Sequence, residues 1–184
     1  MSESDGETGD EADLTHTDES GDVRMVDVGD KPDAARRAVA AGEIRLRPET
    51  VAAIRDDEVG KGDVLATARV GAVQAVKHAW ETIPMCHQIP VTNVETDFEL
   101  REDGVALEVA VETTGKTGCE MEALEGVTTG LNVVWDMVKA AEKSEARSDS
   151  ERSGGTAKKD AEGQYPDTAI ENVRVVEKVK RELE

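Results

Sequence analysis

Aromatic residues, cysteines and long apolar runs are all scarce in this chain of 184 residues, and each scarcity excludes a class of protein. Phe, Trp and Tyr together make up only 2% of the residues. The two cysteines, Cys86 and Cys119, are too few for a disulfide framework, and no CxxC or His-rich pattern predicts a zinc site. No run approaches the ~18 apolar residues of a membrane helix, and the first residues lack a basic-then-apolar signal region. We therefore expect a protein of the reduced cytoplasm, with no membrane partner and no metal.

Positive charge is also in short supply. The chain has 41 acidic and 22 basic residues, which give a net charge of −19 and a pI of about 4.5. Such a surface repels nucleic acids and anionic membranes, so we expect no nucleic-acid partner. Acidic chains with few aromatics can be disordered, but the periodic apolar segments described below predict a folded middle. The acidic excess is typical of the solubility charge of proteins from a high-salt, halophilic cytoplasm.

Two segments have the composition of unfolded chain. Residues 1–22 hold nine Asp or Glu and no Lys or Arg, which predicts a disordered acidic tail. From Glu142 to Gln164 there is no Val, Ile, Leu, Met or aromatic residue, which predicts a flexible insert at about 142–164. We expect a single domain at 23–184 that contains this insert.

The most informative stretch runs from Thr113 to Lys139, where a glycine-bracketed turn carrying Lys116 leads into a long predicted helix. Its apolar residues recur at spacings of three and four, as in a helix that lies on a core: Leu124, Val127, Leu131, Val134, Val138 and Ala141. The opposite side of the same helix carries Met121, Glu122, Glu125, Asn132, Asp136 and Lys139. A solvated surface with one i, i+3 ion pair would explain that side. However, Met121 and Trp135 are large apolar residues that are unfavourable on a solvated surface, and they favour a functional face.

One motif in this stretch is a false match to a phosphate-binding loop. Gly115-Lys116-Thr117 resembles the end of a phosphate-binding P-loop, but that motif needs a glycine five residues before its Gly-Lys pair. The residue at that position is Ala110, inside an alternating strand. The sequence therefore excludes a P-loop nucleotide hydrolase.

The first segments of the domain carry conflicting patterns. The run Arg24–Val28 predicts a short edge strand. Residues 33–47 are ambiguous, because their alanines and arginines favour a helix. An alternating set in the same segment favours a strand instead: Arg36, Ala38, Ala40, Gly42, Ile44 and Leu46. Propensity alone leaves both alternatives open.

Two helices are predicted next. One begins at Pro48, which suits the first helical position, and ends near Arg55. A better one extends from an Asp63 N-cap to about Trp80, and its small residues would let another backbone approach closely. Arg69 is anomalous, since it falls among the apolar positions of this helix. A cation there is costly unless it pairs with a local carboxylate or binds an anion, and both alternatives remain open.

The segment 83–90, Ile-Pro-Met-Cys-His-Gln-Ile-Pro, is a stiff loop because prolines stand near both its ends. It presents Cys86 and His87 in fixed positions. A lone histidine is more often structural than catalytic, but a histidine beside a cysteine in such a loop is a better candidate for a site.

The remaining segments predict strands. Residues 94–101 and 105–113 alternate on either side of a Glu102-Asp103-Gly104 turn, which predicts a hairpin. Residues 169–180 predict a closing strand. The expected result is two or three helices packed on a mostly antiparallel sheet, an α+β sandwich of two layers.

Several blocks, taken together and in order, resemble a known family. The blocks are Met25–Val28 (Met-Val-Asp-Val), Lys61–Arg69 (Lys-Gly-Asp-Val-Leu-Ala-Thr-Ala-Arg), Ile83–His87 (Ile-Pro-Met-Cys-His), Thr114–Leu124 (Thr-Gly-Lys-Thr-Gly-Cys-Glu-Met-Glu-Ala-Leu) and Trp135–Ala140 (Trp-Asp-Met-Val-Lys-Ala). They are similar to those of cyclic pyranopterin monophosphate synthase, the molybdenum cofactor biosynthesis protein C family. This family is a lyase that acts early in molybdenum cofactor (molybdopterin) biosynthesis. The similarity covers roughly residues 25–143 and the last strand.

The resemblance implies a ferredoxin-like α+β fold, with helices packed on one face of a mostly antiparallel sheet. It implies a homohexamer, built as a trimer of dimers. The implied small-molecule substrate is the 3′,8-cyclised dihydro-GTP, which the family rearranges to a pyranopterin while it closes a cyclic phosphate and releases diphosphate. No metal or organic cofactor is implied.

Matched position by position, the resemblance also implies site residues. Asp136 matches the proposed catalytic acid/base, with the catalytic lysines Lys61 and Lys139 beside it. The residues that match substrate-contacting positions are Met85, Cys86, His87, Met121, Glu122, Glu120, Arg36, Lys31 and Lys178. The last three match in a looser context, and the insert blurs the register of the last one.

These residue types suit the chemistry. A triphosphate needs several fixed cations, and we expect one cleft to hold Lys61, Lys116, Arg69, Lys139 and Lys178. Ring opening and closure need proton transfers, which a carboxylate–lysine pair can perform. We therefore expect Asp136 and Lys139 to move protons while Lys61 and His87 hold the phosphates or the leaving diphosphate.

The spacing along the long helix adds a constraint. Glu122 and Asp136 are 14 residues apart, or about 21 Å in a straight helix. Either Gly126 and Gly130 bend the helix sharply, or a second subunit completes each site. We favour the second alternative, with sites at subunit interfaces.

Two functions of other classes are alternatives to the synthase. A non-catalytic ligand-binding or assembly protein of the same fold would be expected to lose Lys61, His87, Asp136 or Lys139, and all are present. A phosphohydrolase of ordinary nucleotides would need a metal-binding carboxylate cluster or a P-loop, and the sequence predicts neither.

Overall fold

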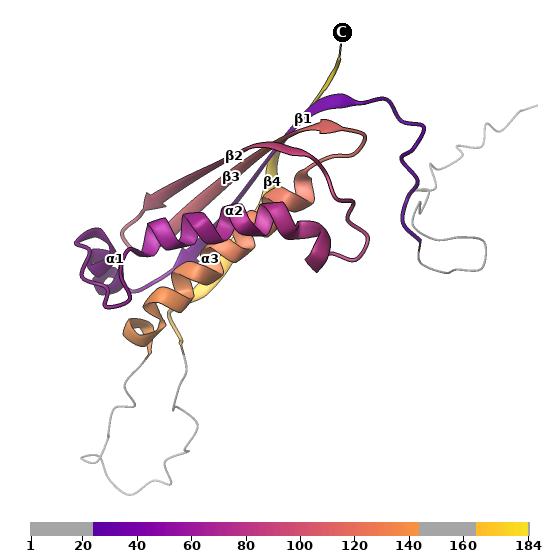
Figure 1. The fold of residues 1–184 in the computed structure, drawn as a ribbon. Helices are drawn as coiled ribbons and strands as arrows, with labels where there is room; N and C mark the ends of the chain where they lie inside the picture. The colour runs from indigo at the N-terminus through magenta and orange to yellow at the C-terminus, as the bar shows by residue number, and fades with distance from the viewer. Residues whose placement is uncertain (1–23, 144–164, 184) are drawn as a thin grey trace, which may run out of the picture.

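The computed structural model describes residues 24–143 and 165–183. Figure 1 shows its elements, which are β1 (Ala34–Arg45), α1 (Pro48–Arg55), α2 (Val64–Thr82), β2 (Val91–Leu100), β3 (Gly104–Gly115), α3 (Glu120–Glu142) and β4 (Ala169–Glu182). The predicted helices, hairpin and closing strand are confirmed. The tail predicted at 1–22 and nearly all of the insert predicted at about 142–164 lie outside the described residues.

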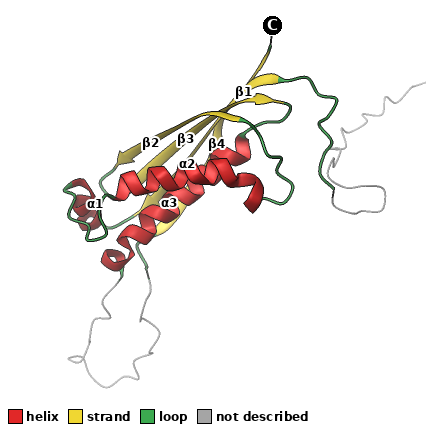
Figure 2. Cartoon of the chain, in the orientation of Figure 1, coloured by secondary structure: helices red, strands yellow, loops and turns green. Residues whose placement is uncertain are grey.

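The four strands form one antiparallel sheet in the order β2-β3-β1-β4. Helices α2 and α3 pack against each other on one face of this sheet, and the short α1 lies at one end (Figures 1 and 2). Apart from α1, the chain runs strand, helix, strand, strand, helix, strand, which is the ferredoxin-like topology. The predicted α+β fold class is therefore confirmed.

The ambiguous segment at 33–47 forms β1, which pairs with β3 on one side and β4 on the other. Ala38 and Ile44 of its alternating set are at most 1% exposed. A Cβ added at Gly42, in the same set, would lie 2.9 Å from a side-chain carbon of Val127 in α3, so this set faces the helix. Helix propensities differ by only about 0.7 kcal/mol per residue. Pairing on both edges and burial of one face therefore decide the structure.

The edge strand predicted at 24–28 is wrong, because these residues form no strand. The Asp27 carboxylate accepts a hydrogen bond from the backbone N–H of Gly29 at 2.8 Å. The backbone N–H of Lys31 donates to the carbonyl of Val28 at 3.1 Å. These local bonds fold the segment into a turn, in competition with strand pairing.

Small residues let α2 and α3 approach closely, as predicted. A Cβ added at Gly126 would lie 2.8 Å from Val76 of α2, and one added at Gly130 would lie 2.5 Å from Leu107 of β3 and 3.3 Å from Ala72 of α2. A larger residue at either glycine would force the helices apart or displace the core.

Glu142, the last residue of α3, contacts the segments that precede α1 and β4. The Glu142 side chain is 0% exposed. It accepts hydrogen bonds from the backbone N–H of Arg47 at 3.2 Å and from the hydroxyl of Thr168 at 2.7 Å. Arg47 Nε lies 3.9 Å from the same carboxylate. Because Arg47 precedes α1 and Thr168 precedes β4, this carboxylate fixes both elements against α3.

Candidate active site

The predicted site residues gather at the two ends of α3. At its N-terminal end, the loop before α3, the 83–90 loop and the last part of β4 surround a cavity of about 540 Å³, here called the loop-end cavity. Its lining contains every predicted substrate-contacting residue, and the full set is Lys31, Arg36, Met85, Cys86, His87, Lys116, Thr117, Gly118, Glu120, Met121, Glu122, Lys178 and Lys180.

Arg36 fixes the turn that leads into α3. Its Nε donates to the carbonyl of Gly115 at 3.1 Å, and its Nη2 donates to the carbonyl of Lys116 at 3.2 Å. The Lys116 ammonium in turn donates to the carbonyl of Gly29. The guanidinium therefore positions a second cation in the lining of the loop-end cavity, and Lys116 fastens the preceding turn.

Glu120 and Lys178 form an ion pair in the same lining, between α3 and β4. Burial acts to raise the pKa of Glu120. The hydrogen bond and charge of Lys178 outweigh burial, so the pKa lies below its usual value. One carboxylate of the cavity is thus ionised and already neutralised by a cation.

Cys86 and Glu122 make a different kind of pair. The Cys86 thiol donates a hydrogen bond to Glu122 Oε1, at 3.4 Å. Burial, followed by the charge of Glu122, raises the pKa of Cys86 to about 12. Burial also raises the pKa of Glu122. At neutral pH Cys86 is therefore a thiol that donates a hydrogen bond, and it is a poor nucleophile.

Glu122 is buried, although the helical periodicity predicts it on the polar side of α3. Glu122 is 3% exposed, and its Oε2 has no hydrogen-bond partner among the described residues. The residue lies in the first turn of α3, where the 83–90 loop contributes Cys86 as its neighbour. Helical periodicity separates the residues that face the sheet from those that do not. It does not show that a loop elsewhere in the chain covers one of the latter, as the 83–90 loop covers Glu122.

The three predicted catalytic residues meet at the C-terminal end of α3. Lys61 Nζ lies 2.9 Å from Asp136 Oδ2, and Lys139 Nζ lies 2.6 Å from Asp136 Oδ1. These three residues are here called the helix-end cluster. Hydrogen bonds from Lys139 and then Lys61 lower the pKa of Asp136 to about 2, and the bond to Asp136 raises the pKa of Lys139. Two ammonium groups around one carboxylate leave the helix-end cluster with a net positive charge.

The loop before α2 brings Lys61 to this cluster. Gly62 has a φ of +98°, in the region that favours glycine. The next residue, Asp63, caps α2 as predicted, since its side chain accepts a hydrogen bond from the N–H of Ala66 at 2.9 Å. A glycine turn followed by a fixed N-cap thus holds the lysine at the end of the neighbouring helix.

Arg69 belongs to neither group. Its guanidinium donates to the carbonyl and the hydroxyl of Thr96 in β2 and lies 5.4 Å from the ring centroid of Phe98. Its partners are thus an uncharged residue and an aromatic face, neither a carboxylate nor an anion. The expectation that one cleft holds Lys61, Lys116, Arg69, Lys139 and Lys178 is therefore wrong for a single chain.

The loop-end cavity and the helix-end cluster are separate within one chain. Helix α3 is continuous from Glu120 to Glu142, and Figure 1 shows no break in it. Its interior glycines serve the contact with α2. The separation of about 21 Å between Glu122 and Asp136 therefore applies.

Sequence reasoning misses several residues that line these sites. Thr117, Gly118 and Lys180 line the loop-end cavity, and Lys180 could have been found because it follows Lys178 by two residues in a strand. Tyr165 lies at the other end of α3. A hollow of about 270 Å³ there is lined by Asn132, Trp135, Asp136, Lys139 and Tyr165. No local pattern predicts that tyrosine, because its position depends on a contact between distant parts of the chain.

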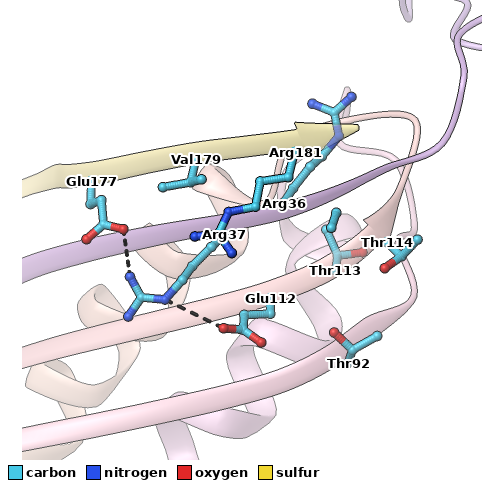
Figure 3. A pocket seen from close by; sticks show the side chains of 10 residues that line it. Arg36, Arg37, Thr92, Glu112, Thr113, Thr114, Glu177, Val179 and Arg181 are labelled. Carbon is cyan, nitrogen blue, oxygen red and sulfur yellow. Dashed lines mark hydrogen bonds and ion pairs between the residues drawn. The ribbon is translucent and has the colours of Figure 1, made fainter. Parts of the chain in front are cut away.

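Another hollow of about 270 Å³ lies on the sheet face away from the helices (Figure 3). Arg37 there lies between Glu177 at 2.9 Å and Glu112 at 3.6 Å. Two carboxylates already neutralise this guanidinium, so we do not include the hollow in the candidate site.

Among residues 24–143 and 165–183, no group of three or more His, Cys, Asp or Glu side chains is arranged to hold a metal ion. None of the helices in those two ranges has both the length and the apolar character needed to cross a membrane. Cys86 and Cys119 are both free thiols.

Comparison with known proteins adds the family. The model of the MoaC family matches residues 25–180. The chain belongs to the MoaC family. This result confirms the resemblance inferred from the ordered blocks of the sequence.

Relatives in the MoaC family match almost the whole chain. A probable cyclic pyranopterin monophosphate synthase of Natronomonas pharaonis is 67% identical over 174 residues, which cover 95% of this chain and 99% of the relative. A protein of Pyrococcus furiosus with the same description is 47% identical over 169 residues, 92% of this chain and 97% of the relative. A probable cyclic pyranopterin monophosphate synthase accessory protein of Methanothermobacter thermautotrophicus is 49% identical over 170 residues, 92% of this chain and 96% of the relative.

Proposed function

We propose that this chain is a cyclic pyranopterin monophosphate synthase, a lyase of molybdenum cofactor biosynthesis. It converts (8S)-3′,8-cyclo-7,8-dihydroguanosine 5′-triphosphate to cyclic pyranopterin monophosphate and releases diphosphate. Membership of the MoaC family and the descriptions of the relatives support this function. The observation that carries it is the helix-end cluster, in which Asp136 is held between Lys61 and Lys139.

Asp136 and Lys139 move the protons of the reaction, because ring opening and closure both need an acid and a base. In the free protein the pKa of Asp136 is about 2, which is too low for an effective base at neutral pH. A substrate oxygen or ring nitrogen that accepts hydrogen bonds from Lys61 or Lys139 takes those donors away from Asp136. The pKa of the carboxyl group then rises, so substrate binding activates the base.

The loop-end cavity binds the charged part of the substrate. Lys31, Lys116, Lys178 and His87 contribute donors for phosphate oxygens. Two carboxylates in the same lining would repel a phosphate if both carried free charge. Lys178 neutralises Glu120, and the five Lys and Arg side chains of the lining outnumber its two carboxylates. The cavity is therefore compatible with an anion even though the protein as a whole is acidic.

Each complete site contains parts of two subunits. The triphosphate end of the substrate and the ring that is rearranged are covalently connected, yet the two groups of residues lie at opposite ends of α3 in one chain. A second copy that places its helix-end cluster beside the loop-end cavity brings them together. A homohexamer arranged as a trimer of dimers provides such interfaces by symmetry.

The setting of the enzyme follows from its composition. A net charge of −19 on 184 residues suits a halophilic cytoplasm, where charged surfaces keep proteins soluble. The free thiols Cys86 and Cys119 suit a reducing compartment. The proposed reaction uses protein side chains alone, with no metal or organic cofactor.

The alternative is a non-catalytic member of the same fold, which binds a ligand or assists a synthase. The description of the Methanothermobacter relative as an accessory protein favours keeping this alternative. The presence of Asp136, Lys61 and Lys139 in bonding contact favours catalysis. The two functions differ in turnover, because a non-catalytic member binds the cyclised nucleotide without releasing diphosphate.

The test is incubation of the purified protein with the cyclised nucleotide and, separately, with GTP. We expect pterin fluorescence and diphosphate from the cyclised nucleotide only. Asp136→Asn should lower kcat by about 10²- to 10⁴-fold, the usual contribution of general acid–base catalysis. Lys139→Ala should have a similar effect.

Matched controls come from an exposed ion pair on α2. His78 and Glu81 lie 3.3 Å apart and line neither site. Lys77 is an exposed residue of the same helix and also lines neither site. Glu81→Gln and Lys77→Ala should therefore keep the wild-type rate. Near-normal turnover in both Asp136→Asn and Lys139→Ala would reject the assigned roles, and binding without any turnover by the wild type would favour the non-catalytic alternative.

A further inference from the structure

Tyr165 is the only tyrosine of the chain, and it lies against the helix-end cluster. Its ring centroid is 5.9 Å from that of Trp135, with the two planes at 85°. This edge-to-face arrangement is a favourable one for aromatic rings. Trp135 directly precedes Asp136 in α3 and packs against the hydrophobic core, so the indole is a firm support for the phenol ring.

The position of Tyr165 is fixed by more than this ring contact. Its carbonyl accepts a hydrogen bond from the N–H of Thr168 at 3.3 Å, which closes a turn before β4. The hydroxyl of Thr168 donates to the buried Glu142 carboxylate at 2.7 Å. A chain of contacts thus runs from the end of α3 through the turn to the tyrosine.

The hollow beside these rings combines apolar and charged walls. Trp135 and Tyr165 supply two aromatic rings, while Asn132, Asp136 and Lys139 supply polar groups. After Asp136, Tyr165 also contributes to the raised pKa of Lys139, which is consistent with a phenol near the ammonium group. A volume of about 270 Å³ lies below the range of about 300–1,000 Å³ for pockets that enclose a whole small ligand. The hollow therefore suits one part of a larger ligand.

We propose that Tyr165, supported by Trp135, contacts the planar nitrogen heterocycle of the substrate and holds it against Asp136 and Lys139. The proposal rests on the proposed function, and it adds a substrate-contacting residue that the family motifs did not include. Aromatic rings bind flat heterocycles by stacking and by edge contacts. Asp136 and Lys139 need such a support, because proton transfer requires the reacting ring within hydrogen-bond reach. The phosphates extend away from this hollow toward the cations of the second subunit's loop-end cavity.

Binding can be measured separately from turnover by using the tryptophan as a probe. The chain has two tryptophans, so Trp80→Phe leaves Trp135 as the only one. Trp80 lies on α2, is 39% exposed and does not line the hollow, so this background should keep the wild-type activity. We would titrate this variant with GTP, which carries a ring and a triphosphate, and with inorganic triphosphate, which carries no ring.

We expect GTP to quench Trp135 emission saturably, whereas inorganic triphosphate should leave it nearly unchanged. Adding Tyr165→Ala should weaken GTP binding by about 5- to 150-fold, the usual effect of removing one base–aromatic contact. The affinity for inorganic triphosphate, which is measured by isothermal titration calorimetry, should not change on this substitution. In turnover of the cyclised nucleotide, Tyr165→Ala should raise KM by a similar factor, and Tyr165→Phe should keep most of the affinity because it keeps the ring.

A purely structural tyrosine would give a different pattern. If Tyr165→Ala keeps its fold, as judged by thermal unfolding, but changes neither the Kd of GTP nor the KM by more than about twofold, the proposal is wrong. If the alanine variant does not fold, Tyr165→Leu fills the same space without an aromatic ring, and its Kd and KM decide in the same way. Failure of the wild type to turn over the cyclised nucleotide would reject the proposed function instead, and the GTP titration would still test the ring contact.

Discussion

The two ends of α3 carry carboxylates of opposite character. At the N-terminal end, Glu122 is buried, one of its oxygens has no hydrogen-bond partner among the described residues, and its pKa is raised. At the C-terminal end, Asp136 is exposed, bonded to two lysines, and its pKa is lowered to about 2. The helix dipole would produce the opposite pKa shifts, since the N-terminus of a helix stabilises negative charge and the C-terminus disfavours it. Burial at one end and lysines at the other therefore outweigh the dipole.

A third carboxylate on the same helix shows that burial alone does not leave a carboxylate without hydrogen-bond partners. Glu142 is as buried as Glu122, but it accepts hydrogen bonds from Arg47 and Thr168. Its role is structural, since it joins α3 to α1 and β4. A buried carboxylate whose oxygens all accept hydrogen bonds, such as Glu142, stabilises the fold. A buried carboxylate with an oxygen that accepts none, such as Glu122, or an exposed one between two cations, such as Asp136, is available to a ligand.

The largest expected effect concerns Cys86, the neighbour of Glu122. With a pKa of about 12 in place of 9.0, its thiolate fraction at pH 8 is about 10³-fold lower than that of an ordinary cysteine. In a Cys119→Ser background, iodoacetamide should therefore alkylate Cys86 about 10²- to 10³-fold more slowly than a free cysteine peptide. Adding Glu122→Gln removes a negative neighbour and should speed the reaction several-fold. Alkylation of Cys86 at the rate of the peptide would contradict the buried environment assigned to this end of α3.

The next effect is on stability. Glu142→Ala leaves the Arg47 N–H and the Thr168 hydroxyl without their acceptor, at a cost of about 2–4 kcal/mol in the free energy of unfolding. Urea denaturation measures this loss. The matched control is Glu81→Ala on α2, an exposed carboxylate whose removal should change stability by no more than about 0.5 kcal/mol. Equal stability of the two variants would show that Glu142 is not a structural link.

The smallest effect is a pair of opposite pH dependences. Burial raises the pKa of Glu122 above its unfolded value of 4.5, so its contribution to stability is present below that pH and is lost as the pH rises through the folded pKa. Hydrogen bonds lower the pKa of Asp136, so its contribution is present above 3.8 and is lost as the pH falls toward about 2.

Urea denaturation across pH 2 to 8 measures both dependences. Glu122→Gln should flatten the fall in stability above pH 4.5, and Asp136→Asn should change only the acid limb, weakly because Asp136 is exposed. If both variants changed the pH dependence of the free energy of unfolding in the same way, the opposite pKa shifts assigned to the two ends of α3 would be contradicted.

Local patterns predict most of the fold. The periodicity of α3, the Asp63 cap and the hairpin turn are signals carried by neighbouring residues, and the structure confirms them. β1 was ambiguous because its alanines favour a helix, and only pairing with β3 and β4 decides between the alternatives. The strand expected at 24–28 fails for the opposite reason, since local turn bonds replace pairing with a distant strand.

The candidate site is predictable only in part. The motif blocks name the residues that the structure gathers at each end of α3. They do not predict that Arg69 bonds to Thr96 or that Glu122 is covered by the 83–90 loop. Nor do they predict Tyr165, whose contact with Trp135 joins residues far apart in the sequence. Each miss depends on which distant segment lies beside a residue, and that information is absent from local spacing.

Subunit mixing tests the central claim most directly, namely that a substrate site needs both ends of α3 from different copies. One partner would carry Asp136→Asn, and the other would carry Lys116→Ala with Lys178→Ala. Each alone should be nearly inactive. After equal mixing and exchange, confirmed by mass spectrometry, about a quarter of the sites should combine two intact halves and regain activity in that proportion. Mixed assemblies no more active than their parents would contradict a site shared between subunits.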